Sequence, residues 1–434
     1  IVTFDRIAHC GADAIIEGSS TVRMTRIAAL AAAGALLVGC SSGTSTTTSQ
    51  QPDSSDQGSA STEAATGGES TGGESQVAAG APIKIGFFSP VTGPTASDGK
   101  NSRAGAELAA EQLNAKGGVA GHQIDLISYD DQGSAAQGTA VARKLIQQDE
   151  VAVGISGAYS DVGAAAAQAF QDASVPMISA YGVSAAVTAP GNFIFRTGSL
   201  GEVEGYAAAK FAKDDLKISS VAILECDADP CADVASATST RMGEQGITVT
   251  ADEKFALSET SFGSIIDRVL EGNPDMVVVD GYYDAVAQII PALREKNQTV
   301  KIMIATLSDS TSLIDLAGAE TVEGVYLTSP FARSDTADVN DFIKAFKDKT
   351  GHAPDEVAAT SYDAVIIAAA SLTATNGAGG AALRDAIAGL HDVQGMVCTA
   401  LQSITDQSIV RDMGIVQIHD GDFAPVTTIP FPKS

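Results

Sequence analysis

The sequence predicts an α/β protein built from two doubly wound lobes, each a parallel sheet covered by helices. From residue 82 onward, short β-branched apolar runs alternate with alanine-rich helical patterns. Runs that are apolar almost throughout are typical of parallel strands that are buried on both faces. This alternation continues almost to the end of the 434-residue chain, which is more than one hydrophobic core organises. We therefore expect two such lobes.

The predicted strands share β-branched, apolar composition and turn residues at their ends. They are expected at residues 83–88, 124–130, 151–156, 175–179, 193–198, 221–226, 276–281, 301–306 and 324–330. A helix is expected at 103–116, where apolar residues recur at i, i+3, i+4 and i+7 before Gly117 and Gly118 end the pattern. In folds of this class, ligands bind at the carboxyl ends of the strands.

Composition limits the classes of partner. The formal net charge is −27, so nucleic acid and anionic membrane surfaces would be repelled. Hydrophobic residues make up 44% of the chain and charged residues 18%, which favours a folded body over general disorder. Within this body no run of eighteen or more apolar residues occurs, so no transmembrane helix is expected there.

The N-terminal 81 residues are expected to lie outside the two lobes. Residues 1–23 show no periodic pattern and are interpreted as upstream sequence that is not part of the natural protein. Residues 24–39 contain a basic residue and a twelve-residue apolar run, which has the length of a signal peptide. The run ends in "LVGC", which resembles the lipobox of bacterial lipoproteins. The resemblance implies that Cys40 is lipidated, although a buried cysteine at the end of a core helix is the alternative.

Residues 40–81 are expected to be a disordered tether behind the lipidated cysteine. The segment after Cys40 has no lysine, arginine or aromatic residue, and it contains a tandem "TGGES" repeat. It cannot bury enough apolar surface to offset the loss of chain entropy. A Gly/Ser-rich chain of roughly 40 residues has an r.m.s. span of about 35 Å. We therefore interpret Cys40 as a lipid anchor on the outer face of a cytoplasmic membrane, and the tether as a flexible segment that lets the folded body move above the membrane surface.

Several stretches together resemble one family. They are "SPVTGPTASDG" after the first strand, "EQLNAKGGVAGHQIDLISYDDQGS" (111–134), "VPMISAYGVSAAVTAPGNFIFRTG" (175–198) and "SYDAVIIAAASL" (361–372). In this order they are similar to the periplasmic leucine/isoleucine/valine-binding proteins, the receptor components of ABC importers. The resemblance covers residues 83–425. It implies the type I binding-protein fold, in which a three-crossing hinge joins the two lobes. One lobe would comprise residues 82–200 and 331–411, and the other residues 201–330 and 412–434.

The resemblance implies several ligand-binding residues. The family's carboxylate-binding serine matches Ser160 in "GAYSDVGAAAAQAF", and the residues alone also predict an anion site at this helix start, with a simple N-cap as the alternative. Tyr282 matches a tyrosine that lies over the ligand. In the second carboxylate loop, Tyr181 would offer a carbonyl and Val183 a backbone N–H, with Ser184 beside it.

Three positions depart from the family's pattern. Asp98 stands where the family has an aromatic residue, and Pro230 and Cys231 replace another. The glutamate that receives the ligand ammonium aligns with Thr306, and Asp309 follows three residues later. Asp98 is either a ligand contact or an N-cap of the first helix. These departures disfavour a branched-chain aliphatic ligand and favour a small amino acid-like or amide-like solute with a polar end.

The remaining cysteines predict a structural bridge. Cys226 and Cys231 enclose "DADP", and in an oxidising compartment a disulfide here would contribute about 2 kcal/mol by loop entropy. Two thiols, or a pairing with Cys398, are the alternatives. The spacing is not C-x-x-C, the five histidines are scattered, and no nucleotide-binding or G-x-S-x-G motif occurs. The sequence therefore predicts no enzyme, no cofactor and no metal.

Three functions remain to be compared. The first is an extracytoplasmic, membrane-anchored solute receptor, expected as a monomer, that delivers its solute to ABC permease subunits. A ligand-sensing subunit of a signalling system and an anchored α/β hydrolase are the alternatives. The hydrolase lacks a nucleophile–base constellation in the sequence, so the receptor is the prediction.

Overall fold

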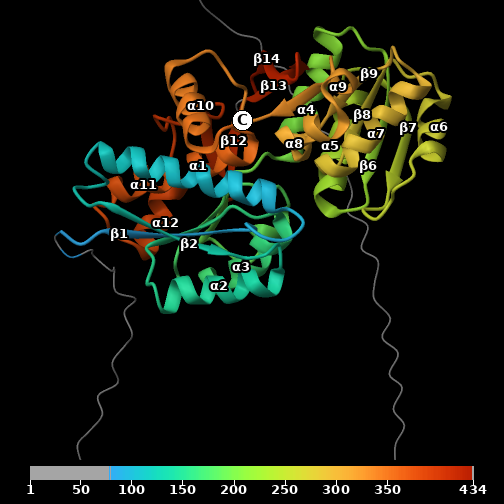
Figure 1. Cartoon of the computed structure of the whole chain (residues 1–434). Helices are drawn as coiled ribbons and strands as arrows, with labels where there is room; N and C mark the ends of the chain where they lie inside the picture. Colours follow the sequence, from blue (N-terminus) through green and yellow to red (C-terminus); the bar gives the residue numbers. More distant parts are fainter. Residues whose placement is uncertain (1–77, 79, 433–434) are drawn as a thin grey trace, which may run out of the picture. The chain divides into compact units, whose positions relative to one another are not determined.

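A computed structural model describes residues 78 and 80–432. The upstream segment, the signal peptide, Cys40 and nearly all of the tether lie outside these residues, so those predictions are not addressed by the structure. The described chain contains two seven-stranded sheets, each flanked by helices (Figure 1). We call the first sheet with its helices the first lobe, and the second sheet with its helices the second lobe.

The first lobe is built on the strand order β11-β12-β5-β4-β3-β1-β2. Its strands are β1 (Ile83–Ser89), β2 (Ile124–Asp130), β3 (Val153–Ser156), β4 (Met177–Ser179), β5 (Ile194–Arg196), β11 (Leu401–Thr405) and β12 (Ser408–Arg411). Its helices are α1 (Ala96–Ala115), α2 (Ala135–Gln147), α3 (Ser160–Asp172), η1 (Ala185–Val187), α10 (Ala337–Thr350), α11 (Glu356–Ala374) and α12 (Gly380–Ala388). The strands from β2 to β12 pair in parallel, and β11 is antiparallel to β12.

The second lobe repeats this plan with the order β14-β13-β10-β9-β8-β6-β7. Its strands are β6 (Ser220–Cys226), β7 (Thr248–Phe255), β8 (Met276–Asp280), β9 (Lys301–Ile304), β10 (Tyr326–Ser329), β13 (Met413–His419) and β14 (Asp422–Ile429). Its helices are α4 (Gly201–Asp214), α5 (Asp229–Glu244), α6 (Gly263–Glu271), α7 (Tyr283–Lys296), η2 (Thr306–Ser308), α8 (Thr311–Ala317) and α9 (Ala319–Val322). The chain passes between the sheets three times: after β5, after β10 and after β12.

The predicted parallel α/β lobes are confirmed, with one addition in each lobe. The late hairpins β11–β12 and β13–β14 add antiparallel pairs to sheets that are otherwise parallel. The strand prediction also missed β7, an edge strand in which exposed and half-buried residues alternate instead of forming an apolar run. The helix expected at residues 103–116 begins earlier, at Ala96.

Helix α11 forms the centre of the first lobe. Among the described residues it is the one helix long and apolar enough to cross a membrane, but 83% of its apolar window is buried. It packs against α1, where a Cβ on Gly105 would come within 2.1 Å of the Ala358 carbonyl oxygen. Glycine at this point therefore allows the two helices to approach closely. We interpret α11 as a core helix.

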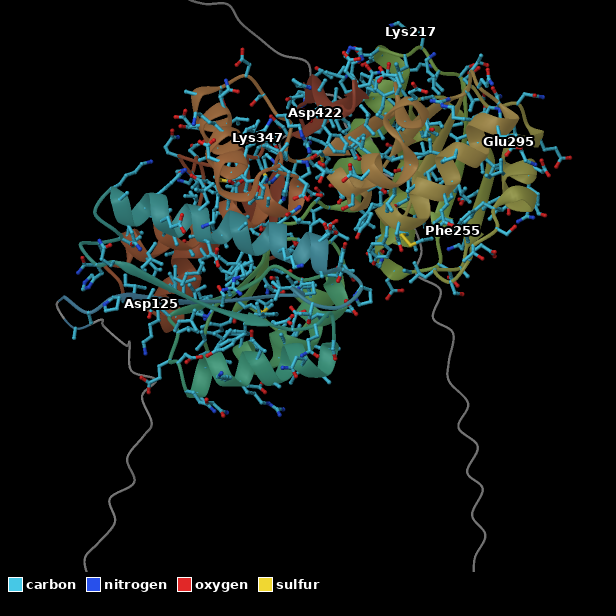
Figure 2. The ribbon with its side chains drawn as sticks, in the orientation of Figure 1. Asp125, Lys217, Phe255, Glu295, Lys347 and Asp422 are labelled. Atoms are coloured by element: carbon cyan, nitrogen blue, oxygen red, sulfur yellow. A yellow bond between two sulfur atoms is a disulfide. The ribbon has the colours of Figure 1, made fainter. Side chains whose placement is uncertain are left out.

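Exposed charged side chains surround both lobes. Figure 2 labels five that are exposed: Asp125, Lys217, Glu295, Lys347 and Asp422. Phe255, also labelled, is buried beside the disulfide of the second lobe. Apolar residues are thus inside and charges outside, and the buried charged residues described below stand out against this arrangement.

Candidate functional site: the junction between the lobes

The carboxyl ends of the strands carry most of the predicted ligand-binding residues. In the first lobe, β1 leads to Asp98, β3 to Ser160 and β4 to the loop at residues 180–184. In the second lobe, β8 leads to Tyr282 and β9 to Thr306. Three contacts join the lobes around these residues, namely the hydrogen bonds of Ser310 to Asp98 and of Thr306 to Glu356 and the ring contact of Tyr159 with Tyr282. They define the site that we call the lobe junction.

Ser160 joins the start of α3 to the loop after β4. Its hydroxyl oxygen accepts the backbone N–H groups of Val183 (3.1 Å) and Ser184 (3.2 Å). A hydroxyl has two acceptor sites and one donor, so the O–H of Ser160 remains available to donate. The first backbone N–H of this helix with a partner is that of Gly163, which donates to the Tyr159 carbonyl. The preceding N–H groups and the hydroxyl together form an anion-binding arrangement.

The loop after β4 differs in detail from the expectation. The Val183 N–H, expected to face the ligand, donates to Ser160 instead. The Ser184 hydroxyl accepts from the Ala186 N–H and so caps η1. Val183 and Tyr181 are both 4% exposed and pack with the hydrophobic core of the second lobe. The loop therefore connects the two lobes as well as supporting Ser160.

Three tyrosine rings meet at the junction. Tyr159 packs edge to face on Tyr181 (5.2 Å between ring centroids) and on Tyr282 of the second lobe (5.3 Å). Burial raises the pKa of Tyr282 to about 12, and it raises those of Tyr159 and Tyr181 well above the usual value. All three hydroxyls therefore keep their protons at neutral pH. The sequence prediction missed Tyr159, although it directly precedes Ser160.

Asp98 lies in the junction and does not cap α1. The N-cap of that helix is Thr95, whereas the Asp98 carboxylate accepts hydrogen bonds from the Tyr159 hydroxyl and, at 3.3 Å, from the Ser310 hydroxyl of the second lobe. Asp98 is 4% exposed. Burial raises its pKa to about 6, against the lowering effect of the two hydroxyls.

Asp309 follows the position of the family's ammonium-binding glutamate by three residues, but in the structure its carboxylate is paired within the chain. Arg333 donates to both of its carboxylate oxygens, at 3.1 and 2.6 Å, and the Ser329 hydroxyl donates at 2.5 Å. The Arg333 guanidinium also lies over the rings of Phe331 and Phe423. This is a buried, paired carboxylate whose oxygens already have partners, so it is a structural group rather than a free ligand acceptor.

Thr306 lies between two buried glutamates that the sequence prediction missed. Its backbone N–H donates to Glu204 of α4 (3.2 Å), and its hydroxyl donates to Glu356 of α11 (2.5 Å). Glu356 is fully buried, and Glu204 is 1% exposed. The second bond crosses from the second lobe to the first. Neither glutamate had a sequence signal, because each lies far along the chain from Thr306.

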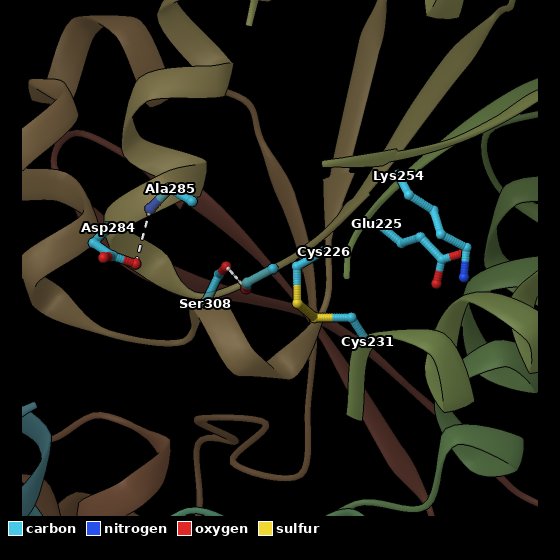
Figure 3. Close-up of a disulfide and its surroundings, with 8 residues drawn as sticks. Glu225, Cys226, Cys231, Lys254, Asp284, Ala285 and Ser308 are labelled. Atoms are coloured by element: carbon cyan, nitrogen blue, oxygen red, sulfur yellow. Dashed lines mark hydrogen bonds and ion pairs between the residues drawn. A yellow bond between two sulfur atoms is a disulfide. The ribbon is translucent and has the colours of Figure 1, made fainter. Parts of the chain in front are cut away.

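A disulfide lies beside the junction in the second lobe. It joins Cys226, at the end of β6, to Cys231, in the first turn of α5 (Figure 3). Both cysteines are fully buried in the cluster that contains Tyr181 and Val183. Cys398 is a buried thiol, so in the structure the alternatives of two thiols or a Cys398 pairing do not occur.

Two cavities lie near these residues. One of about 390 Å³ is lined from both lobes, by Pro90, Thr95, Tyr159, Leu257, Tyr282 and Tyr283 among others. The other, of about 560 Å³, runs along α4 and α5 and is lined by Arg241 with Glu202 and Glu244, which pair with it. Of the predicted ligand residues it contains only Val183. The first cavity also contains one predicted ligand residue, Tyr282, but it is lined from both lobes and opens beside the tyrosines, so it is the better candidate for solute entry.

One group of side chains could in principle hold a metal ion. Among the described residues, Glu323, His419 and Asp420 bring their ligand atoms close together, and all three are exposed. His419 already pairs with Glu323 at 2.6 Å. An exposed ion pair on a hairpin accounts for this group without a metal.

The family is decided by comparison with known proteins. Residues 82–422 match the family model described as "Periplasmic binding protein". The chain belongs to this family. Periplasmic binding proteins of this group include a leucine-, isoleucine-, valine-, threonine- and alanine-binding protein of Pseudomonas aeruginosa, 28% identical over 288 residues, covering 66% of this chain and 77% of the relative. The Leu/Ile/Val-binding protein of Escherichia coli is 28% identical over 257 residues, covering 59% and 70%.

Solved structures support the same fold. A leucine-binding protein of Thermotoga maritima superposes with a TM-score of 0.71 at 22% identity, covering 80% of this chain and 99% of the other. A branched-chain amino acid transporter substrate-binding protein of Streptococcus pneumoniae, solved with isoleucine, gives 0.70 at 24% identity, covering 80% and 99%. A solute-binding protein of Rhodopseudomonas palustris, solved with 3,4-dihydroxybenzoic acid, gives 0.71 at 23% identity, covering 81% and 98%. These relatives are binding proteins, and this periplasmic binding protein is likewise not an enzyme.

Proposed function

We propose that this periplasmic binding protein is the extracytoplasmic, lipid-anchored solute receptor of an ABC importer. Membership of the family supports the receptor role, and the relatives named above bind amino acids or work with transporters. The solute would be held at the lobe junction and delivered to permease subunits without being chemically changed.

The observation that carries this proposal is the arrangement around Ser160. Its hydroxyl is oriented by two backbone N–H groups, so its own proton is free to donate, next to the N–H groups that open α3. The positive end of the helix dipole adds to the attraction for an anion. A solute carboxylate suits this arrangement because it has four acceptor sites and a full negative charge.

The side-chain end of the solute is proposed to be polar. A leucyl side chain would have to cover the Asp98 carboxylate, which is buried and has hydroxyl partners but no cationic one. Desolvating such a group against an aliphatic chain is costly. We therefore propose a small amino acid-like or amide-like solute, preferred over leucine, isoleucine or valine.

Calorimetric titration of the chain tests the proposal. The panel contains leucine, isoleucine and valine, together with polar amino acids, polyamines and short amides. Tightest binding is expected for a polar, carboxylate-bearing member. If the aliphatic trio binds most tightly and Asp98→Ala does not change this, the solute class is wrong.

A matched pair of serine substitutions tests the carboxylate site. Ser160→Ala should weaken carboxylate ligands by about 1.5–3 kcal/mol, roughly 10- to 100-fold. Ser134→Ala is the control, because Ser134 caps α2 of the same lobe by accepting from Gln137. The control should lose about 1 kcal/mol of stability but no affinity. Equal affinities in all three proteins would contradict the carboxylate site.

The lipid anchor is a separate part of the proposal, supported by the residues before Cys40. In cells given radiolabelled palmitate, the wild-type chain should be labelled and Cys40→Ala should not. Label on the Cys40→Ala protein would contradict lipidation at this residue. The solute-binding proposal does not depend on this result.

A further inference from the structure

Two of the contacts that join the lobes end on carboxylates. The Ser310 hydroxyl of the second lobe donates to Asp98 of the first lobe (3.3 Å), and the Thr306 hydroxyl of the second lobe donates to Glu356 of the first (2.5 Å). Both carboxylates are buried. If the lobes separate, each carboxylate exchanges this hydroxyl for water. Part of the burial of both groups is therefore a property of the closed arrangement, in which the lobes touch.

Asp355 adds a third buried carboxylate at the same place. It directly precedes Glu356, and its oxygens accept from the Asn101 side chain (2.6 Å) and from the Ala358 N–H (3.1 Å), both in the first lobe. Burial raises the pKa of Asp355, and among the charged groups around it Asp98 raises this pKa most, so the two carboxylates lie close together. We call Asp98, Asp355 and Glu356 the junction carboxylates.

Among the described residues, no lysine or arginine nitrogen lies within 4.0 Å of the junction carboxylates. Arg333 is paired with Asp309 at 2.6 Å, and Arg411 is paired with Asp363 at 3.9 Å. Burial raises the pKa of Glu356, and the charge of Arg411 lowers it by less. Ionisation of all three junction carboxylates would therefore leave buried negative charge without a paired cation, which is strongly unfavourable.

The charged groups that face the junction carboxylates from the elements packed around them are mostly acidic. Three are carboxylates and one is a cation: Asp284 of α7, Asp309 at the end of η2, Glu204 of α4 and Arg411 of β12. The neighbouring tyrosine hydroxyls are uncharged at neutral pH, because burial raises the pKa of each; they belong to Tyr159, Tyr181, Tyr282 and Tyr283. The net effect of burial and of these charges is to favour the neutral form of the junction carboxylates.

The protonation of the junction carboxylates depends on whether the lobes are closed. In the structure, burial raises the pKa of Asp98 from 3.8 to about 6 and that of Asp355 from 3.8 to about 8, and it raises the pKa of Glu356 well above its ordinary value of 4.5. A carboxyl group that water reaches when the lobes separate has a pKa near its ordinary value and releases its proton at pH 7. The closed form therefore binds more protons than the open form at neutral pH.

We propose that closure of the two lobes takes up protons at the junction carboxylates, so that acidification favours the closed form and tightens the binding of the solute. Each proton comes from water or buffer and binds to a carboxylate oxygen. Linkage is reciprocal, so a solute that closes the lobes also takes up protons when it binds. The effect on solute binding rests on the proposed function, whereas proton-linked closure needs no solute.

Small-angle X-ray scattering of the chain without any solute tests proton-linked closure. The radius of gyration should be smaller at pH 5.5 than at pH 8.5, since this range spans the protonation of Asp98 and Asp355. The triple substitution Asp98→Asn, Asp355→Asn and Glu356→Gln replaces the three carboxylates by neutral amides. At both pH values this junction variant should scatter as the wild type does at pH 5.5. Asp98→Asn alone, a milder change, should lose part of the difference between the two pH values.

A matched triple substitution at the surface is the control. Asp125→Asn, Glu295→Gln and Asp422→Asn remove the same number of acidic side chains from exposed positions (Figure 2). This variant should keep the wild-type difference between the two pH values, so a general decrease in charge repulsion is distinguished from protonation at the junction. Thermal unfolding of each protein at both pH values checks that it is folded.

Calorimetry measures the link to the solute. The tightest-binding member of the panel is titrated at pH 7 into the wild-type chain in phosphate and in Tris, because the ionisation enthalpies of the two buffers differ and the difference in heat reveals the protons exchanged. Net proton uptake is expected. For each proton taken up, the affinity should rise by up to about 10-fold when the pH is lowered by one unit.

The outcomes separate this inference from the proposed function. If the wild-type radius of gyration is the same at pH 5.5 and pH 8.5, or if the junction variant changes as much as the wild type, proton-linked closure is wrong and the proposed function stands. Binding without proton uptake would overturn the effect on the solute. If no member of the panel binds, the proposed function is wrong, and the scattering of the solute-free chain still decides proton-linked closure.

Discussion

Asp309 and Glu356 are two buried carboxylates at the same junction, but their partners differ completely. Asp309 is held by the two terminal guanidinium nitrogens of Arg333 and by the Ser329 hydroxyl. Glu356 receives one hydroxyl, from Thr306, and among the described residues it has no lysine or arginine nitrogen within 4.0 Å, although the charge of the buried Arg411 lowers its pKa against the larger effect of burial. Burial alone therefore does not tell a structural carboxylate from one that is available to a ligand.

The comparison shows that the role of a buried carboxylate depends on its hydrogen-bond and ion-pair partners. A buried carboxylate with an arginine partner contributes to the fold, because its charge is neutralised before any ligand arrives. A buried carboxyl group without a paired cation is stable only when it is protonated or when a cationic ligand binds to it. Burial accordingly raises the pKa of Glu356 well above its ordinary value. Substituting the partners of these carboxylates, or neutralising a carboxylate itself, should therefore change the stability of the protein in ways that can be measured.

The largest effect is expected from removing the partner of Asp309. Arg333→Ala leaves that carboxylate buried without a cation and removes packing from Phe331 and Phe423. The free energy of unfolding should fall by about 3–5 kcal/mol, measured by urea denaturation at pH 7.5. Adding Asp309→Asn to this variant should restore part of the loss.

Arg268→Ala is the control for the arginine substitution. Arg268 pairs with Glu253 at 2.8 Å on the surface, so its loss should cost less than about 1 kcal/mol. If Arg333→Ala costs no more than this control, Asp309 does not depend on its partner and the comparison fails.

The next effect concerns pH and Glu204, the carboxylate on the other side of Thr306. Burial raises its pKa from 4.5 to about 7. The folded chain therefore holds a proton that the unfolded chain releases above about pH 4.5, so this contribution to stability is present below pH 4.5 and is lost as pH rises through 7. The shift corresponds to on the order of 3 kcal/mol.

Glu204→Gln should remove this part of the pH dependence. Asp98 and Asp355, with pKa values raised by burial to about 6 and about 8, contribute with the same sign, so the informative quantity is the difference between wild type and variant. Urea unfolding between pH 4.5 and 7.5 measures it. A difference that does not change across this range would contradict the assigned environment of Glu204.

The smallest of the three effects concerns Asp98, which has hydroxyl partners but no cation. Tyr159→Phe keeps the ring contacts with Tyr181 and Tyr282 and removes one of the two hydroxyls that donate to the carboxylate. A loss of about 1.5 kcal/mol in unfolding free energy is expected, since the acceptor is charged at pH 7.5. Tyr129→Phe, in the edge strand β2, should cost less than about 0.5 kcal/mol.

Much of the fold is predictable because it is coded locally. The parallel strands from β1 to β10 are mostly apolar runs, and their helices show amphipathic spacing. Strand β7 was missed because an edge strand faces water and lacks that run. The edge strands β11 and β14 of the late hairpins are interrupted by half-buried and exposed residues in the same way. This reason does not apply to their partners β12 and β13, which are mostly buried and were also missed.

The site is predictable only where a contact follows from one element. Ser160 begins a helix, so its position alone indicates an anion site. The bonds of Thr306 to Glu204 and Glu356 join residues 102 and 50 positions apart, and they depend on how helices α4 and α11 approach the end of β9. The pairing of Arg333 with Asp309 likewise depends on the second crossing between lobes. No local sequence pattern predicts contacts between residues that are this far apart in the chain.

The central claim is that one solute is held between the two lobes, with Ser160 on one side and Tyr282 on the other. Small-angle X-ray scattering of the chain, with and without a saturating concentration of the tightest-binding member of the calorimetric panel, tests it most directly. A smaller radius of gyration in the bound protein is the predicted result, because the ligand favours the closed arrangement. An unchanged scattering profile at full saturation would contradict closure around the solute.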